Sequence, residues 1–324
     1  MDRIGVFDSL YSLMIYCVLE ERPLERTVFI FGDNIKIGGI RVKNYKRLFG
    51  RENILTRLAG EIYDKYACKK ILKKYPGLPI YGQDHIRLGN KMVGMREFYV
   101  IEDGSENYMD HLREKERSGL KSFLVKGIKK ILGINSTYGV HRNVKKVYLT
   151  GLGKIPKSIE NKVEIVNLRN LWEKKSPEEK REILEFFSLE EDILKIDGGI
   201  MIFTQPLSED GIISEKRKIE LYGEIIKKYP LEKIIIKSHP REKTDYKKIF
   251  PVKVLDKPVP FELLSLGGIK IHRAVTLFST AALGIKDIPV DFYGTEVDEN
   301  IFKRFGSCDK IMERNAYLGD DHEK

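Results

Sequence analysis

Short apolar runs rich in β-branched residues alternate along the chain with longer stretches of helical periodicity. In the first half of the chain, these runs predict strands at residues 4–7, 27–31, 97–101, 145–150 and 163–166. Asp8 and Ser9 follow the first run and can cap a helix, and residues 41–75 have helical periodicity. Strands that alternate with helices indicate βαβ units and a mainly parallel sheet.

A charged helical stretch interrupts this alternation, which then begins again. Ser176-Pro177-Glu178-Glu179 opens the stretch with a pattern typical of helix starts. Beyond it, the pattern predicts strands at 199–204, 233–237 and 252–255, an amphipathic helix at 214–228 and a terminal helix from residue 300. We therefore predict an α/β protein with domains at residues 1–175 and 198–324, joined by a helical connection at 176–197.

The composition is that of a soluble globular protein. Of the 324 residues, 42% are hydrophobic, and the mean hydropathy is -0.33. The longest apolar stretch near the start, residues 9–19, is too short and too polar to span a bilayer, and no cleavable signal pattern is present. The three cysteines are dispersed without metal-ligand spacing, which indicates a reducing compartment and a cytoplasmic location.

The chain carries a net charge of +10, from 58 Lys and Arg against 48 Asp and Glu. This surplus favours an anionic partner, although a lysine-rich surface with no specific partner accounts for it equally well. Lysines and glutamates are interleaved throughout, and no zinc-finger spacing, arginine-rich arm or RNA-binding signature occurs. The surplus therefore favours an anionic substrate or membrane face, and no nucleic-acid partner is expected.

A pair of carboxylates, Glu102 and Asp103, follows a predicted strand and precedes Gly104. Ligands of open α/β sheets bind at the carboxyl ends of the strands, where such an acid could accept a proton from a hydroxyl nucleophile. Taken alone, these residues fit an ordinary polar turn better. A rival base, Asp210, lies in the loop after the first strand of the second domain, where a turn aspartate is the simpler interpretation.

A histidine and a pair of hydroxyls stand at two further strand ends. His239 follows an apolar run and precedes Pro240 and Arg241, so that it could contact a phosphate, protonate a leaving group or simply pack in a turn. Ser279 and Thr280 precede small residues that suit the start of a helix. Hydroxyls and free backbone N–H groups there can bind phosphate, cap the helix, or do both.

Three other polar residues are secondary candidates: Gln83 and His85 in the first domain and Glu262 in the second. The chain contains no Asp-x-Asp motif, no glycine-rich P-loop and no paired-histidine metal site. A metal-dependent nucleotide enzyme would need clustered oxygen ligands. The sequence therefore favours phosphate binding by protein donors alone, with no metal or other cofactor.

Three short motifs follow strand ends in a fixed order along the chain. They are Glu102-Asp103-Gly104, His239-Pro240 and Ser279-Thr280. Their order and spacing resemble the acidic, His-Pro and Ser-Ser/Thr motifs of the bacterial sialyltransferases. The sequence is most similar to glycosyltransferase family 52, the lipooligosaccharide and capsular sialyltransferases, over residues 78–290. Thr280 departs from the family's second serine but keeps a hydroxyl.

The resemblance implies a GT-B architecture with two Rossmann-like domains, mainly parallel sheets, and an active site in the cleft between them. It implies transfer of sialic acid from CMP-sialic acid to a galactose-type hydroxyl of a lipooligosaccharide or capsular saccharide, with inversion and without a metal. A lipid-linked acceptor would place the enzyme in the cytoplasm, peripheral at the inner face of the cell membrane. The sequence leaves the oligomeric state open, a homodimer included.

The resemblance also implies which residues bind the donor. His239 would stabilise or protonate the CMP phosphate as sialic acid departs. Ser279 and Thr280 would hold the other phosphate oxygens, and Glu262 would bind the ribose hydroxyls. The remaining family-like positions on the donor side are Pro240, Thr204 and Gln205.

A carboxylate of the first domain would deprotonate the acceptor hydroxyl, and the acidic motif points to Asp103. Within family 52, an aspartate in the loop that contains Asp210 has also been given this role, so Asp210 is the alternative. Residues expected to contact the acceptor or to support the base are Glu102, Gly104, Gln83 and His85.

Two other functions stay open on the sequence. The same fold could use another nucleotide-sugar donor, such as a glucosyl or galactosyl donor, because family 52 also includes enzymes that resemble glucosyltransferases. The chain could instead be a non-catalytic protein that binds a nucleotide or saccharide. The presence of an acid, the histidine and the hydroxyl pair together argues against the non-catalytic protein.

Overall fold

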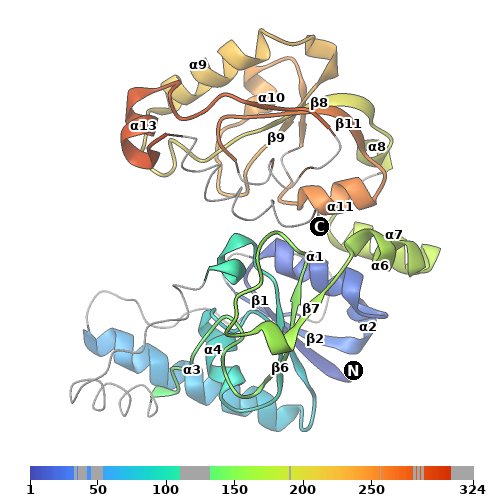
Figure 1. Cartoon of the computed structure of the whole chain (residues 1–324), viewed down its shortest axis with the longest axis vertical. Coiled ribbons are helices and arrows are strands. Elements are labelled where there is room, and N and C mark those ends of the chain that lie inside the picture. Colours follow the sequence, from blue (N-terminus) through green and yellow to red (C-terminus); the bar gives the residue numbers. More distant parts are fainter. Residues whose placement is uncertain are drawn as a thin grey trace. The chain divides into compact units, whose positions relative to one another are not determined.

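The computed structural model of the chain describes residues 1–32, 35, 42–44, 54–109, 132–189, 191–255, 257–279, 282, 285 and 288–307. These residues belong to two compact units, Met1–Phe187 and Ser188–Lys324. Figure 1 shows that each unit has its own sheet with helices packed around it.

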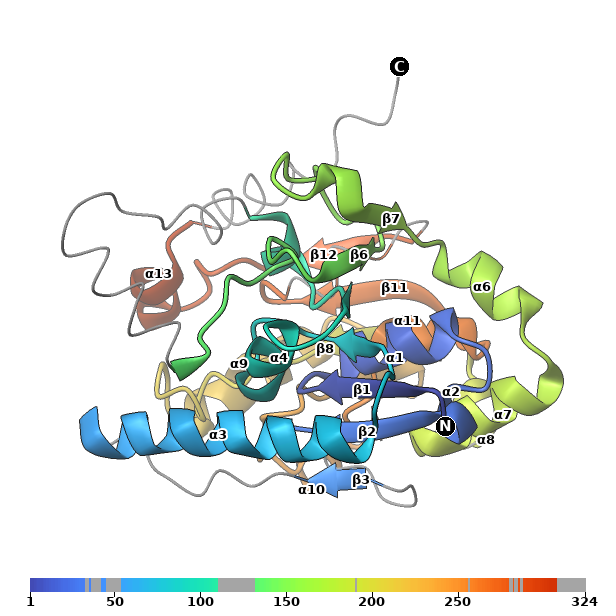
Figure 2. The same ribbon diagram turned by 90° about the horizontal axis from the view of Figure 1, so that it is seen from below.

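The described strands of the first unit form a parallel sheet in the order β3-β2-β1-β4-β5-β6-β7. The strands are β1 (Arg3–Phe7), β2 (Thr27–Phe31), β3 (Val42–Asn44), β4 (Ile80–Gly82), β5 (Phe98–Ile101), β6 (Val144–Leu149) and β7 (Val163–Ile165). The helices are α1 (Leu10–Leu19), α2 (Pro23–Arg26), α3 (Ile54–Lys74), α4 (Arg87–Val93), η1 (Ser105–Tyr108), η3 (Glu160–Lys162), α6 (Leu168–Lys174) and α7 (Pro177–Phe186). Figure 2 shows β3, β2 and β1 next to one another, with β2 in the middle.

The centre of this sheet is buried on both faces, which explains its sequence. All residues of β1 and β2 are buried, as expected for parallel strands covered by helices on each side. The rings of Phe7, Tyr16 and Phe29 pack together, with centroids 5.2–6.4 Å apart. Ser9 caps α1, because its side chain accepts a hydrogen bond from the Ser12 N–H at 3.2 Å.

The second unit contains a parallel sheet in the order β10-β9-β8-β11-β12. Its strands are β8 (Asp197–Phe203), β9 (Ile234–Lys237), β10 (Lys253–Leu255), β11 (Lys270–Thr276) and β12 (Val290–Phe292). The described helices are α8 (Glu191–Leu194), α9 (Glu215–Ile226), η4 (Leu231–Lys233), α10 (Tyr246–Ile249), α11 (Phe261–Leu266) and α13 (Glu299–Phe305). Ile202 and Ile236 pack with Tyr222 of α9 on one face, while Phe203 meets the ring of Phe261 on the other, at 5.4 Å.

Both sheets reverse their strand order at one point. In the first unit, β1 pairs with β2 on one side and with β4 on the other. In the second unit, β8 has β9 and β11 as its two neighbours. The carboxyl ends of strands at such a switch point form the usual ligand-binding edge of an open α/β sheet.

The predicted fold class is confirmed, since both sheets are parallel and alternate with helices. The prediction of helix over all of residues 41–75 was wrong at its start, because residues 42–44 form β3 and α3 begins at Ile54. A three-residue edge strand with a central lysine lacks the apolar run that marks the buried strands. The short strand β12 was missed for the same reason, with an aspartate at its centre. No helix in the described part of the chain is both long and apolar enough to cross a membrane.

Replacing the cap of α7 should destabilise the first unit. Ser176 and Glu179 form a capping box, with the Glu179 N–H donating to Ser176 Oγ at 3.2 Å. We expect Ser176→Ala to lower the free energy of unfolding by about 1 kcal/mol, because it removes this acceptor. Ser176→Thr keeps the acceptor and serves as the control in urea denaturation. Equal midpoints for the two variants would contradict the role of the cap.

Candidate active site

At the carboxyl edge of the first sheet, a carboxylate and an imidazole meet. Asp103 follows β5, and its Oδ2 lies 3.0 Å from Nε2 of His85, which follows β4. Its Oδ1 accepts a hydrogen bond from Ser12 Oγ at 3.3 Å, and its backbone N–H donates to Asn107 Oδ1 at 2.6 Å. The side chains of Asp103 and His85 are only 20% and 16% exposed. The structure thus brings together the expected base and one expected supporting residue.

The environment of His85 favours its protonated form. Burial lowers the pKa of His85, but the hydrogen bond and negative charge of Asp103 outweigh burial, so that the pKa is raised. The charges of Asp84 and Glu106 act in the same direction. The imidazole stacks on the ring of Tyr138, with centroids 4.6 Å apart. This arrangement can hold a proton on the imidazole next to a carboxylate.

Glu102 points into the interior and supports the loop that carries Asp103. Its carboxylate is fully buried and accepts hydrogen bonds from Tyr108 Oη at 2.8 Å, Thr150 Oγ1 at 3.0 Å and Tyr11 Oη at 3.2 Å. Burial raises the pKa of Glu102, and these hydrogen bonds oppose the rise. Its contacts therefore fasten the end of β5 to the end of β6.

Gln83 and Gly104 shape the same edge through the backbone. Gln83 is buried, and its Oε1 accepts hydrogen bonds from the N–H groups of Asp8 at 2.7 Å and Ser9 at 3.2 Å. This glutamine therefore joins the end of β4 to the start of α1. Gly104 has φ +89°, a conformation that favours glycine, and it allows the turn between Asp103 and η1.

At the carboxyl edge of the second sheet, His239 follows β9 in a tight turn. Its Nδ1 accepts a hydrogen bond from the Arg241 N–H at 3.2 Å, and its own N–H donates to Glu242 Oε2 at 2.8 Å. Burial lowers the pKa of His239 to about 4, and the charges of Arg241 and Lys237 add to this effect. Since Nδ1 is an acceptor, the neutral ring has its proton on Nε2. In the free protein at neutral pH, His239 therefore offers an uncharged Nε2–H donor.

Residues of the neighbouring strand ends are joined to one another. Gln205 follows β8, and its Oε1 accepts a hydrogen bond from the Phe278 N–H, beyond β11, at 3.3 Å. Thr204 Oγ1 donates to Glu242 Oε2. The Ser279 N–H donates to Thr276 Oγ1 at 3.0 Å, while Thr280 lies outside the described residues. These contacts draw the exits of β8, β9 and β11 together at one edge.

The remaining candidates have different surroundings. Asp210, the alternative base, forms a two-pronged ion pair with the exposed Arg241, at 2.5 and 3.1 Å. Pro240 is exposed in the turn after His239. Burial raises the pKa of Glu262, at the start of α11, and the charge of Lys237 opposes this rise. Asp210 therefore forms an ion pair with Arg241, whereas Glu262 lies near Lys237 without a direct ion pair to it.

Lys237 is a site residue that the sequence interpretation missed. Its side chain is 8% exposed, and in the part of the chain that the structure describes its ammonium forms no ion pair or hydrogen bond. Burial lowers its pKa to about 8, which the charge of Glu262 partly offsets. The signal was a charged residue at the last position of the apolar strand β9. A buried cation of this kind, two residues before His239, suits an anionic ligand.

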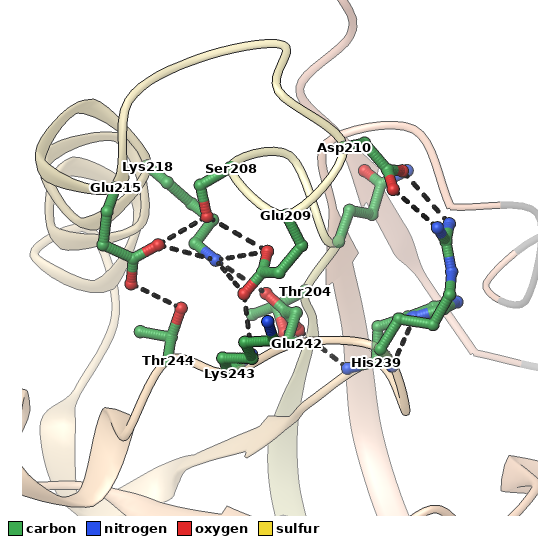
Figure 3. Close-up of polar contacts among 12 residues, drawn as sticks. Thr204, Ser208, Glu209, Asp210, Glu215, Lys218, His239, Glu242, Lys243 and Thr244 are labelled. Carbon is green, nitrogen blue, oxygen red and sulfur yellow. Dashed lines mark hydrogen bonds and ion pairs between the residues drawn. The ribbon is translucent and has the colours of Figure 1, made fainter.

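Two further groups were missed because their sequence context is not distinctive. Ser12 lies in the apolar helix α1, where nothing marks its contact with Asp103. Lys218, Glu209 and Glu242 form a buried ionic group behind His239, shown in Figure 3. Among the described residues, no group of three or more His, Cys, Asp or Glu side chains has the geometry to hold a metal ion.

Two sequence comparisons bear on this site. The family model described as Glycosyltransferase family 52 matches residues 59–300, which include every candidate residue predicted from the sequence. An uncharacterized protein of Haemophilus influenzae is 37% identical over 319 residues, which are 95% of this chain and 99% of that protein.

The fold is similar to solved structures at low sequence identity. An α/β-galactoside α-2,3-sialyltransferase from the marine bacterium Photobacterium phosphoreum has a TM-score of 0.57 and 11% identity, covering 98% of this chain and 96% of that one. A UDP-GlcNAc 2-epimerase from Neisseria meningitidis has a TM-score of 0.46 and 14% identity, covering 98% and 93%. The first similarity shows the fold, which is GT-B-like with two Rossmann-like domains, as the sequence predicts.

We expect His239 to titrate well below an ordinary histidine. An unfolded chain protonates histidine near pH 6.5, about the usual value, whereas the folded protein does so at about 4. The stability that neutral His239 contributes is therefore fully present above the unfolded pKa and is lost as pH falls toward 4. NMR titration of the ring measures this directly, with His239→Gln to assign the signal. A midpoint at or above 6.5 in the free protein would contradict the prediction.

Proposed function

Since the chain belongs to glycosyltransferase family 52, we propose that it is an inverting sialyltransferase that needs no metal. The donor is CMP-sialic acid, and the acceptor is a galactose-type hydroxyl of a lipooligosaccharide or capsular saccharide. The observation that carries this proposal is the edge of the second unit, where the Nε2–H of His239 and the ammonium of the largely buried Lys237 stand at the end of one strand.

The donor side of the reaction needs groups that stabilise a departing phosphate. As the bond from sialic acid to CMP breaks, the sugar becomes oxocarbenium-like and negative charge collects on the phosphate. His239 donates a hydrogen bond from its Nε2–H to that oxygen, and this bond stabilises the charge that develops there while the ring stays neutral. Lys237, a residue that is only 8% exposed, supplies a positive charge where electrostatic attraction is stronger than in bulk water.

Other residues of the second unit hold the nucleotide. Ser279, with Thr280 after it, offers hydroxyls to the remaining phosphate oxygens. Glu262 accepts hydrogen bonds from the ribose hydroxyls, and its closeness to Lys237 supports a carboxylate in the ionised form. Thr204, Gln205 and Pro240 line the same edge of the sheet.

The acceptor side needs a base, and we propose Asp103 for this role. Asp103 takes the proton of the attacking galactose hydroxyl, and the oxygen then attacks sialic acid on the face opposite CMP. His85 orients the carboxylate through the 3.0 Å contact. Asp210 is less suited, because both of its oxygens pair with the guanidinium of Arg241, which is always charged and stabilises the carboxylate against taking a proton.

A lipid-linked acceptor would be met at the inner face of the cell membrane. The net charge of +10 supports electrostatic attraction to an anionic surface. We therefore propose a cytoplasmic enzyme that associates peripherally with that membrane.

Replacing His239 should abolish transfer without unfolding the chain. We expect His239→Ala to lower kcat by about 10²–10³-fold, the usual contribution of a hydrogen-bond donor to a developing negative charge. The assay incubates the protein with CMP-sialic acid and a panel of galactosides, and mass spectrometry scores the product. His272→Ala is the matched control, because His272 is an exposed histidine of β11. Normal turnover of His239→Ala would exclude this mechanism.

The base can be identified by comparing Asp103→Asn with Asp210→Asn in the same assay. We expect the first variant to lose about 10²–10⁴-fold in kcat, because an amide cannot accept the proton. The second should retain most activity, since it weakens only an exposed ion pair. The reverse pattern would assign the base to Asp210.

Nucleotide preference tests the donor separately. CMP should raise the thermal unfolding midpoint, because a ligand that binds only the folded state stabilises it by an amount that grows with the logarithm of its concentration relative to its Kd. UDP and GDP at the same concentration should have smaller effects. Stabilisation by UDP alone would refute the sialyl donor and favour a hexosyltransferase.

A further inference from the structure

Behind His239, a single buried ammonium lies among three carboxylates. Lys218, on the second turn of α9, has a fully buried side chain. Its Nζ is 2.9 and 3.0 Å from the two oxygens of Glu209, 3.1 Å from Glu215 and 3.8 Å from Glu242. Figure 3 shows the ammonium pointing toward Glu209 and Glu215, which come from the loop after β8 and the start of α9.

Each of these carboxylates also accepts a hydrogen bond from a different residue of the segment 239–244, which contains His239. Glu242 Oε2 accepts from the His239 N–H at 2.8 Å. Glu209 Oε1 accepts from the Lys243 N–H at 2.7 Å, and Glu215 Oε1 accepts from Thr244 Oγ1 at 2.6 Å. Hydrogen bonds therefore hold the segment 239–244 at three places, and the three accepting carboxylates all form ion pairs with the Lys218 ammonium.

The contacts of Glu242 favour its ionised form. It accepts hydrogen bonds from Thr204 Oγ1, the His239 N–H and Tyr246 Oη, and the Lys218 ammonium forms an ion pair with it at 3.8 Å. Neither the N–H nor the ammonium can accept a hydrogen bond from a protonated carboxyl group. Burial raises the pKa of Glu242, and these hydrogen bonds together with the charge of Lys218 oppose this rise. Without the cation, a buried carboxylate would be left with neutral donors alone.

Local helix electrostatics do not explain Lys218. A cation near the amino end of a helix opposes the helix dipole, which favours acidic groups there. Buried ion pairs also add little net stability compared with well-packed apolar side chains. The main consequence of the ammonium is therefore geometric: it keeps three carboxylates together and, through them, the turn at His239.

We propose that Lys218 is a positioning residue for the transfer reaction, which fixes the turn at His239 by holding Glu209, Glu215 and Glu242. This inference rests on the proposed role of His239 as the contact to the donor phosphate. Lys218 itself does not touch the substrate. Its loss would leave three carboxylates facing one another, and their repulsion would shift the segment 239–244.

The test compares Lys218→Met with Lys216→Met in the full-length protein. Lys216 is an exposed lysine of the same helix, with a side chain that is 90% exposed, so its variant should behave as wild type. We expect Lys218→Met to lower kcat by about 100-fold, the effect of a misplacement of roughly 1 Å in a catalytic group. Since the acceptor-binding residues are unchanged, the KM for the galactoside should stay the same. Lys218→Arg should recover part of the activity, because it restores the positive charge.

A second readout does not depend on sialyl transfer. The NMR signal of the His239 ring should shift in Lys218→Met and its pKa should move, whereas Lys216→Met should leave both unchanged. If wild type fails to transfer sialic acid, the proposed function falls, and the ring signal still tests the positioning. Wild-type kcat together with an unchanged ring signal in a folded Lys218→Met would overturn the inference.

A milder variant covers the case in which Lys218→Met does not fold. Glu215→Gln keeps the Lys218 ammonium and removes only one of the three negative charges around it. Because the side chain of Glu215 is 47% exposed, this variant should still fold. We expect a loss in kcat of about 3–10-fold, smaller than the loss from a full displacement, with a smaller shift of the His239 signal. No change in either quantity would overturn the inference.

Discussion

Parallel strands that are buried on both faces leave polar side chains little room except at the strand ends, and both units are built on this constraint. The strands β1, β2 and β9 are wholly buried. The candidate catalytic side chains therefore stand where a strand stops: Asp103 after β5 and His239 after β9. Because neighbouring parallel strands end at the same edge, residues far apart in the sequence become neighbours in space.

The same constraint buries some carboxylates away from water, and a buried carboxylate needs partners for its oxygens. The two units supply these partners differently. Glu102 is surrounded by neutral donors, the hydroxyls of Tyr108, Thr150 and Tyr11. Glu242 combines neutral donors with the buried cation Lys218. The first arrangement depends only on hydrogen-bond geometry. The second also depends on charge balance, so that changes on α9 affect the turn after β9.

The apolar pattern predicted most of the fold because a buried parallel strand has a distinctive sequence. Strands such as Thr27–Phe31 and Ile234–Lys237 were expected almost to the residue. The edge strands β3 and β12 were not expected, because their short segments are stabilised by pairing with a neighbour rather than by their own apolar residues. The acidic and His-Pro motifs were recognisable since they stand directly after such runs.

The surroundings of these motifs were less accessible from the sequence. The contact between His85 and Asp103 joins residues 18 positions apart, and nothing in the sequence next to either residue indicates it. Lys237 stands at the end of an apolar strand in a lysine-rich chain, and its burial and its closeness to the charge of Glu262 are set by the tertiary structure. Tertiary packing decides such features, so local patterns do not report them.

Two buried side chains of the first unit form hydrogen bonds with residues that lie far from them in the sequence. Gln83 completes the turn between β1 and α1 from 75 positions away, and Asp84 accepts the N–H groups of Tyr138 and Gly139, 54 and 55 positions further on. During synthesis, the amino-terminal β1–α1 segment therefore emerges long before the residues that complete it. Such long-range closure is characteristic of slow-folding parallel sheets. The edge that presents Asp103 therefore lacks part of its native hydrogen bonds until residue 139 has been synthesised.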